Sequence, residues 1–243
     1  MLKNEKGCAS ERALPLCKGS SGDTGGSRHP LHHQKEENMT IQKRANAAIG
    51  LTILVAVLFL VLPMTPLAGV MKAIGFLFNA LFAGLIGYFF LKDDFIQQFK
   101  HFKFKTLLYG IPLTILTGVA FGLLFHTIAG KPTTNSIDSS ISLVFILTQI
   151  PFMLMGEELI STNLLIAFEK KGLSFTVSSV LVALLFAFWH VTAYGFHPLQ
   201  LLLTLAPLRL VLNFLWKRSS SVWVSWICHF LYDMISLLPM AFK

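Results

Sequence analysis

The sequence predicts an all-α protein, a polytopic transmembrane bundle of about seven spanning helices. Of the 243 residues, 54% are hydrophobic and only 13% are charged, and the mean hydropathy is +0.65. Soluble domains carry about 25% charged residues. A spanning helix needs roughly 20 apolar residues, so most of this chain is used by such helices and no separate soluble domain of ordinary size fits.

Seven apolar segments follow a polar leader. Residues 1–40 are rich in Gly, Ser, Lys and Glu without an apolar period, which predicts a disordered tail, and Met39 is a candidate for the natural start. Residues 41–243 would form the transmembrane domain. The spans are expected at about 46–66, 69–91, 106–129, 141–168, 174–195, 198–216 and 221–242. Pro198 and Pro207 predict a kinked or partly re-entrant sixth span.

The basic residues alternate between the two sides of the expected membrane. One side would hold Lys43, Arg44, Lys92, Lys100, Lys103, Lys105, Lys170, Lys171, Lys217 and Arg218, and the other side Lys72, Lys131 and Lys243. The positive-inside rule then predicts a cytoplasmic N-terminus, in the plasma membrane of the cell. The net charge of +8 therefore reflects topology and the lipid bilayer, and we expect no nucleic-acid partner. The amphipathic stretch KDDFIQQFKHFKFK would lie on the cytoplasmic surface.

Three acids and two histidines stand out inside the apolar spans, where an acid costs about 2.5–3.5 kcal/mol on insertion scales and usually marks a functional site. They are Glu157, Glu158, His190, His229 and Asp233. At 1.5 Å per residue, Glu157, His229 and His190 lie roughly 16, 14 and 22 Å from the cytoplasmic ends of their spans. The hydrocarbon core is about 30 Å thick. We therefore expect three helices to converge on one buried polar pocket.

The spacing of these residues assigns them to helix faces. His229 and Asp233 are four residues apart and share a face. Glu157 and Glu158 are adjacent and point about 100° apart, so one would face the site and the other would brace it. Structural readings remain open: the glutamates as an ion pair with Arg209, the histidines as packing residues, and Asp233 as a group that orients His229.

Together these residues resemble the motifs of the CPBP family, which contains CAAX proteases and bacteriocin-processing enzymes and is also called Abi. The motifs are Glu157-Glu158, Phe186-Ala-Phe-Trp-His190 and His229-Phe-Leu-Tyr-Asp233, and the resemblance covers about residues 141–240, the expected catalytic core. One departure stands out. The first motif of the family reads Glu-Glu-x-x-x-Arg, whereas this chain has Thr162 at the Arg position. We hypothesise that Arg209 supplies the missing cation from another helix.

The resemblance implies an intramembrane endopeptidase that hydrolyses a peptide bond in a membrane-associated peptide or protein, in peptide maturation or bacteriocin self-immunity. Glu157 would be the general base, His190 would position the water, and Glu158 would hold the local geometry. His229 and Asp233 would bind the developing oxyanion or a metal. The family is described both as a metalloprotease and as metal-free, so a zinc ion on His190, His229 and Glu157 is one of two possibilities.

Two other function classes remain open. A degenerate family member, which Thr162 favours, would bind a peptide in the membrane as an immunity or scaffolding protein. A proton-coupled transporter would use the Glu and His side chains as a relay, although no internal repeat is visible. Other protease classes fit less well, because Ser161 lies in no Gly-x-Ser-x-Gly motif and an aspartyl site would need a second Asp besides Asp233.

Overall fold

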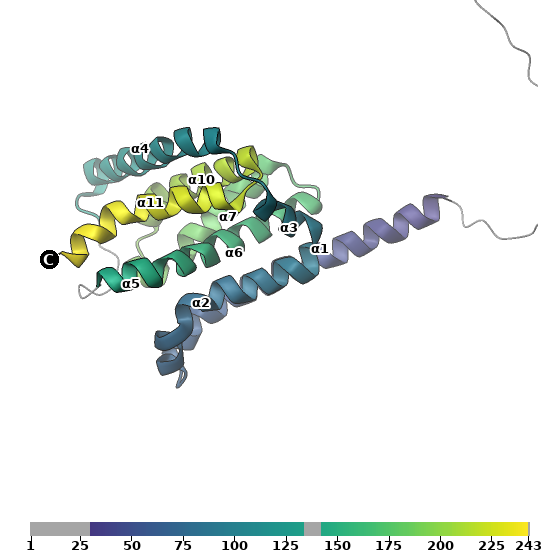
Figure 1. The fold of residues 1–243 in the computed structure, drawn as a ribbon, viewed down its shortest axis with the longest axis horizontal. Helices are drawn as coiled ribbons and strands as arrows, with labels where there is room; N and C mark the ends of the chain where they lie inside the picture. The colour runs from purple at the N-terminus through teal and green to yellow at the C-terminus, as the bar shows by residue number, and fades with distance from the viewer. Residues whose placement is uncertain (1–29, 134–141, 243) are drawn as a thin grey trace, which may run out of the picture.

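The computed structural model describes residues 30–133 and 142–242, and within these ranges every regular element is a helix (Figure 1). The elements in chain order are α1 (Pro30–Val61), η1 (Leu62–Met64), α2 (Ala68–Ile86), η2 (Gly87–Leu91), α3 (Asp93–Lys100), α4 (Phe104–Ala129), α5 (Leu143–Thr148), α6 (Ile150–Lys170), α7 (Phe175–Trp189), α8 (Val191–Tyr194), α9 (Pro198–Gln200), η3 (Leu201–Leu205), α10 (Ala206–Ser219) and α11 (Val222–Ala241).

The predicted fold class is confirmed, because seven helical segments of the described ranges are long and apolar enough to cross a membrane. They are Asn38–Met64, Ala68–Leu91, Phe104–Ala129, Ile150–Lys170, Phe175–Tyr194, Pro198–Ser219 and Val222–Pro239. The protein is thus an integral, multi-pass membrane protein. Consecutive spans run in opposite directions, as the colour gradient shows in Figure 1.

Two boundaries differ from those predicted. Helix α1 already begins at Pro30, inside the segment expected to be a disordered tail, because Gln, Lys and Glu residues allow a helix to extend beyond its apolar part. The remainder of that tail, including Cys8 and Cys17, lies outside the described residues. The fourth apolar segment is divided at Gln149 into α5 and α6, and Pro151 stands in the first turn of α6, where its missing N–H is tolerated.

The ends of the helices that carry most of the basic residues are joined by polar contacts. Lys103 Nζ donates to the carbonyl of Arg218 at 3.0 Å, and Lys217 Nζ lies 2.6 Å from Glu169 Oε1. Helix α3 lies at the same end, on the right in Figure 1, at the position of the predicted amphipathic stretch. With the ion pair between Lys170 and Asp94 of α3, these contacts connect α3, α4, α6 and α10 into one charged rim.

Helix α6 is the central element of the bundle. In its most apolar window 72% of the residues are buried, against 17% to 50% in the other six spans. Gly156 permits a close approach to α2, since a Cβ there would lie 2.6 Å from Asn79 Cβ and 2.7 Å from the backbone N of Ala80. About two turns further on, Asn163 Nδ2 donates to the carbonyl of Ala83 at 2.8 Å. The two glutamates after Gly156 are therefore held at the centre of the protein.

The sixth span, predicted to be kinked or partly re-entrant, contains a π-helical turn within one helical segment. Residues Leu201–Leu205 form η3 between the short α9 and the regular α10, and Pro207 lies in the first turn of α10. Each π turn inserts an extra residue and is often found beside functional sites. The extra residue rotates the residues that follow relative to a continuous α-helix. Arg209, the fourth residue of α10, is among them.

Candidate active site

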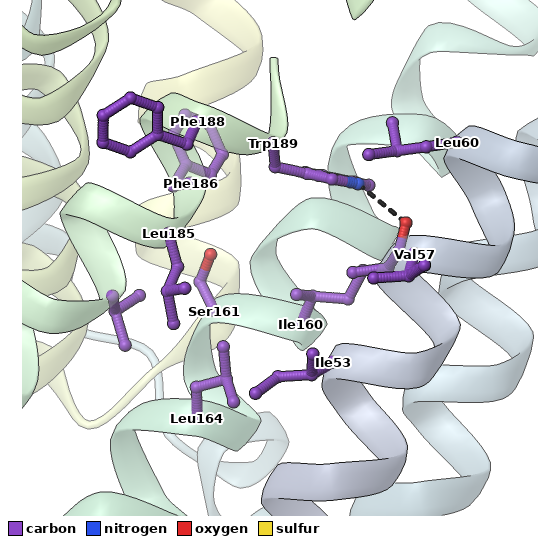
Figure 2. Close-up of a pocket in the computed structure, with 12 residues that line it drawn as sticks. Ile53, Val57, Leu60, Ile160, Ser161, Leu164, Leu185, Phe186, Phe188 and Trp189 are labelled. Carbon is purple, nitrogen blue, oxygen red and sulfur yellow. Dashed lines mark hydrogen bonds between the residues drawn. The ribbon is translucent and has the colours of Figure 1, made fainter. Parts of the chain in front are cut away.

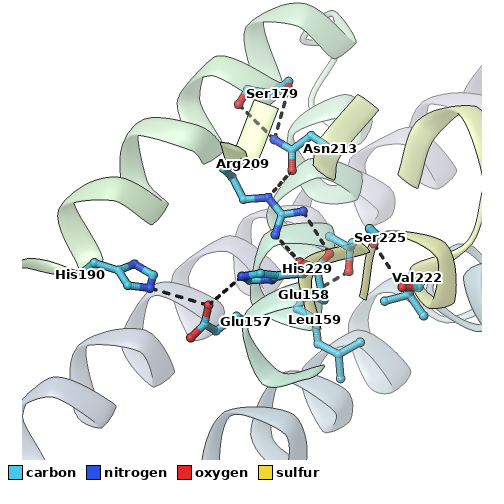
Figure 3. A network of polar contacts seen from close by, with 11 residues as sticks. Glu157, Glu158, Leu159, Ser179, His190, Arg209, Asn213, Val222, Ser225 and His229 are labelled. Atoms are coloured by element: carbon cyan, nitrogen blue, oxygen red, sulfur yellow. Dashed lines mark hydrogen bonds and ion pairs between the residues drawn. The ribbon is translucent and has the colours of Figure 1, made fainter. Parts of the chain in front are cut away.

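Glu157 faces two imidazoles from two other helices (Figure 3). Its Oε2 lies 3.7 Å from His190 Nε2 and 4.0 Å from His229 Nε2. The carboxylate is 15% exposed, and the two imidazoles are 17% and 4% exposed. Both separations exceed a direct hydrogen bond, and polar pairs farther apart than about 3.5 Å are candidates for a bridging water.

Glu158 points in another direction and binds a cation. Its carboxylate receives Arg209 Nη1 at 2.6 Å and Nη2 at 3.0 Å, a two-pronged pairing between two side chains that are both fully buried. It also lies 2.9 Å from His229 Nδ1. Because the guanidinium can only donate, the carboxylate accepts and His229 Nδ1 carries the proton in this contact. Glu158 therefore fixes the ring of His229 so that Nε2 faces Glu157.

The Arg209 side chain is itself fixed by further side chains. Its Nε donates to Asn213 Oδ1 at 2.8 Å, and Asn213 Nδ2 donates to the carbonyl and the hydroxyl of Ser179 at 3.2 and 3.0 Å. The guanidinium also lies over the ring of Phe186, 5.5 Å from its centroid. All the polar partners in this chain of contacts are buried, so few alternative orientations are open to the arginine.

His190 reaches the site because α7 ends there. The residue caps α7 with φ −82° and ψ 8°, outside the helical values, and the chain continues as the short α8. The ring Nδ1 lies 2.8 Å from the carbonyl of Phe186, which only accepts, so this nitrogen carries the proton. In the neutral ring Nε2 is then an acceptor, and it points towards Glu157.

Phe186 forms the apolar wall of the site. Its ring centroid lies 4.4 Å from that of His190 and 6.1 Å from that of His229.

Asp233 lies one helical turn after His229 on α11 and interacts electrostatically with both histidines and with Glu157, while its carboxylate forms no hydrogen bond with the described residues. The structure thus places all five predicted residues in one region, with Asp233 at its border.

The donor atoms have the chemistry of a zinc site but not its spacing. Zinc ligands lie about 2.0–2.2 Å from the ion, so in a tetrahedron they are roughly 3.3–3.5 Å apart, shorter than both distances from Glu157 Oε2. Within residues 30–133 and 142–242, no three His, Cys, Asp or Glu side chains are placed to hold a metal ion. The residues as arranged do not fit a metal, and we derive no chemical step through one.

Sequence reasoning missed Ser179 and the pairing role of Asn213. Neither belongs to a motif, and no periodicity connects Ser179 on α7 with Asn213 on α10. For Asn213 one signal existed, its spacing of four residues from Arg209, which places both on one helix face. The hypothesis that Arg209 supplies the cation missing at Thr162 agrees with the direct contact between Arg209 and Glu158.

Fold and site together define a polytopic membrane protein with paired carboxylates and imidazoles buried in its centre. Residues 139–235 match the family described as Type II CAAX prenyl endopeptidase Rce1-like. These residues are therefore similar to the CAAX protease (CPBP) family that the three motifs predicted, which is a family of membrane endopeptidases. Comparison with curated proteins and with solved structures found no match.

Proposed function

We propose that the protein is an active intramembrane endopeptidase that cleaves a membrane-associated peptide by means of a water molecule activated by Glu157. One observation carries this proposal: a single oxygen of Glu157 faces the Nε2 atoms of His190 and His229 at 3.7 and 4.0 Å. A carboxylate in reach of a water that a second group also holds is the arrangement required for general base catalysis.

Each of the other residues has a separate task in this reaction. His190 Nε2, an acceptor in the neutral ring, takes a hydrogen bond from the water and orients it. Glu157 removes a proton while the water oxygen bonds to the carbonyl carbon. The resulting tetrahedral oxyanion needs a donor nearby. Because His229 Nδ1 donates to Glu158, His229 serves the oxyanion only as an imidazolium that donates from Nε2, and the negative charge of Asp233 favours that form.

The reaction closes with Glu157 as the acid. Its new proton passes to the amide nitrogen, the C–N bond breaks, and the products are a carboxylic acid and an amine. Glu158 and Arg209 do not touch the substrate in this scheme. They keep His229 in place through a buried pair whose polar atoms are hydrogen-bonded.

Arg209 also bears on the competing function. The absence of an arginine at position 162 favoured a degenerate binding protein. Glu158 nevertheless has a cationic partner, because Arg209 of α10 pairs with it. We therefore prefer the enzyme.

We further propose that the charged rim around α3 faces the cytoplasm, since the ten basic residues of that side would obey the positive-inside rule; this puts the N-terminus in the cytoplasm.

The test compares wild type with Glu157→Gln and His190→Ala in detergent on a library of membrane-anchored peptides. Loss of a general base typically lowers the rate 10²–10⁴-fold, so Glu157→Gln should show no measurable cleavage. Glu169→Gln is the matched control, because it removes a carboxylate of the same helix that only pairs with Lys217 at the rim.

Cleavage by wild type and Glu169→Gln alone supports the proposal. Cleavage that persists in Glu157→Gln refutes the role of Glu157. No cleavage by any folded variant, together with retained peptide binding, supports the degenerate binding protein. Uptake into vesicles that depends on a proton gradient would support a transporter.

A further inference from the structure

An apolar pocket of about 220 Å³ opens beside the site, between α1, α6 and α7 (Figure 2). Its walls are aliphatic and aromatic side chains, among them Val57, Leu164 and Trp189. Trp189 Nε1 donates to the carbonyl of Ala56 at 2.9 Å, so a hydrogen bond between α7 and α1 fixes the width of the pocket. No side chain of the described residues occupies this space.

The pocket opens sideways, towards the lipid. Ile53, Val57 and Leu185 at its border are 39%, 47% and 43% exposed, and they belong to spanning helices. An apolar cavity of about 150 Å³ is large enough for a benzene ring. A space of about 220 Å³ therefore accepts a side chain of the size of leucine or phenylalanine that enters from the bilayer.

The pocket adjoins the candidate catalytic groups through two residues. Ser161 lies four residues after Glu157, on the same face of α6 and roughly 6 Å further along the axis. Phe186 lines the pocket and also contacts the ring of His190. An extended peptide rises about 3.3 Å per residue. A side chain one or two residues from a bond held at Glu157 would thus reach the pocket.

Ser161 adds a polar group to the lining of the pocket, one helical turn after Glu157. Its side chain is buried in an otherwise apolar lining, and Figure 2 draws no hydrogen bond between its hydroxyl and the other lining residues. Neither histidine contacts it, which gives no support to a serine nucleophile. A peptide N–H or carbonyl next to the pocket could form a hydrogen bond with the Ser161 hydroxyl.

We propose that this pocket is a specificity site for one large apolar side chain of the substrate, one or two residues from the cleaved bond. The inference rests on the proposed endopeptidase function, since it assumes a peptide bond at Glu157. It assigns the pocket to a substrate side chain rather than to a bilayer lipid, because the volume of about 220 Å³ suits one side chain and because Ser161, one helical turn from Glu157, adds a hydroxyl to the lining.

The experiment uses the full chain in detergent and peptides whose cleaved bond has been mapped by mass spectrometry. Residues on both sides of that bond are varied among Ala, Val, Leu, Phe and Trp. Leu185→Ala enlarges the pocket and Val57→Trp narrows it. The matched controls are Leu184→Ala and Val61→Trp, which alter exposed residues of the same helices outside the pocket.

Wild type should favour Leu or Phe over Ala at one position by about tenfold or more in kcat/KM, as hydrophobic pockets do. Leu185→Ala should shift this preference towards Trp, and Val57→Trp towards Ala and Val, while both controls keep the wild-type profile. Cleavage with the same profile in all five proteins overturns the specificity site and leaves the endopeptidase intact. A wild type that cleaves nothing overturns the proposed function instead.

Cross-linking tests occupancy without turnover. Glu157→Gln is incubated with peptides that carry photoactivatable leucine next to the bond. Cross-links should map to the α1 and α7 residues of the pocket, and cross-links confined to other helices contradict the proposal. Labelling of these residues by a phosphatidylcholine with a diazirine in its acyl chain, undiminished by added peptide, would assign the pocket to lipid and overturn it.

Discussion

Arg209 on α10 and Glu158 on α6 form a fully buried, two-pronged ion pair, with Nη1–Oε1 and Nη2–Oε2 distances of 2.6 and 3.0 Å. Planar guanidinium and carboxylate groups suit this geometry. The same carboxylate holds His229 at 2.9 Å. Glu158 therefore receives its cation from another helix, and the pair joins α6 to α10 at the level of the site.

Removing Arg209 should destabilise the protein strongly. Arg209→Met leaves Glu158 buried without its cation, which typically costs about 3–5 kcal/mol and corresponds to a fall of the unfolding temperature on the order of 10 °C. Thermal unfolding in detergent measures this. Lys217→Met, which breaks the exposed pair with Glu169, is the control and should change the unfolding temperature little.

Returning an arginine to position 162 should rescue part of this loss. Thr162 lies four residues after Glu158, so both lie on one face of α6, and Arg209→Met vacates buried volume beside them. The double variant Thr162→Arg/Arg209→Met should unfold at a higher temperature than Arg209→Met alone. The reverse order would mean that an arginine at 162 does not reach Glu158 in this fold.

The contact of α6 with α2 should tolerate no side chain at Gly156. Gly156→Ala brings a Cβ to 2.6 Å from Asn79 Cβ and 2.7 Å from a backbone nitrogen, so the helices must separate and Glu157 must move. We expect lower stability and lower peptide cleavage. Gly122→Ala on α4 meets no atom within 4 Å and should be neutral or stabilising by up to about 1 kcal/mol. Equal behaviour of the two variants would contradict this packing argument.

Asp233 should matter for rate and little for stability. Its carboxylate has no hydrogen bond to the described residues, while its charge acts on His229. Asp233→Asn should therefore unfold close to the wild-type temperature and cleave about tenfold more slowly, as expected for the loss of one electrostatic interaction of about 1.4 kcal/mol in the transition state. The measurement is kcat at saturating peptide, with Asp94→Asn as the control. An unchanged kcat would remove Asp233 from the mechanism.

Chelation should leave peptide cleavage unchanged. The distances from Glu157 Oε2 to the two imidazoles exceed those between ligands of one zinc ion, and the proposed steps use only protein groups and water. The assay compares activity before and after 1,10-phenanthroline, with the metal content of the protein measured in parallel. Loss of activity that added zinc restores would show that a metal participates.

Several features were predictable from the sequence because their cause is local. Long apolar runs predict spanning helices, since the bilayer thickness fixes the length of a span. The cost of burying Glu157 and His229 in lipid marked them as interior residues. The spacing of Pro198 and Pro207 predicted an irregular sixth span, which the structure shows as a π turn.

Other features depend on which helices are neighbours, and no local pattern contains that information. The sequence determined seven spans, their buried acids and the family that residues 139–235 resemble. Only the tertiary structure decided that Arg209 pairs with Glu158 across 51 positions of sequence, that Ser179 completes the network, and that α1 and α7 leave an apolar pocket next to Glu157. Packing of helix against helix depends on side-chain shape at each contact, such as Gly156 against α2, and not on hydrophobicity alone.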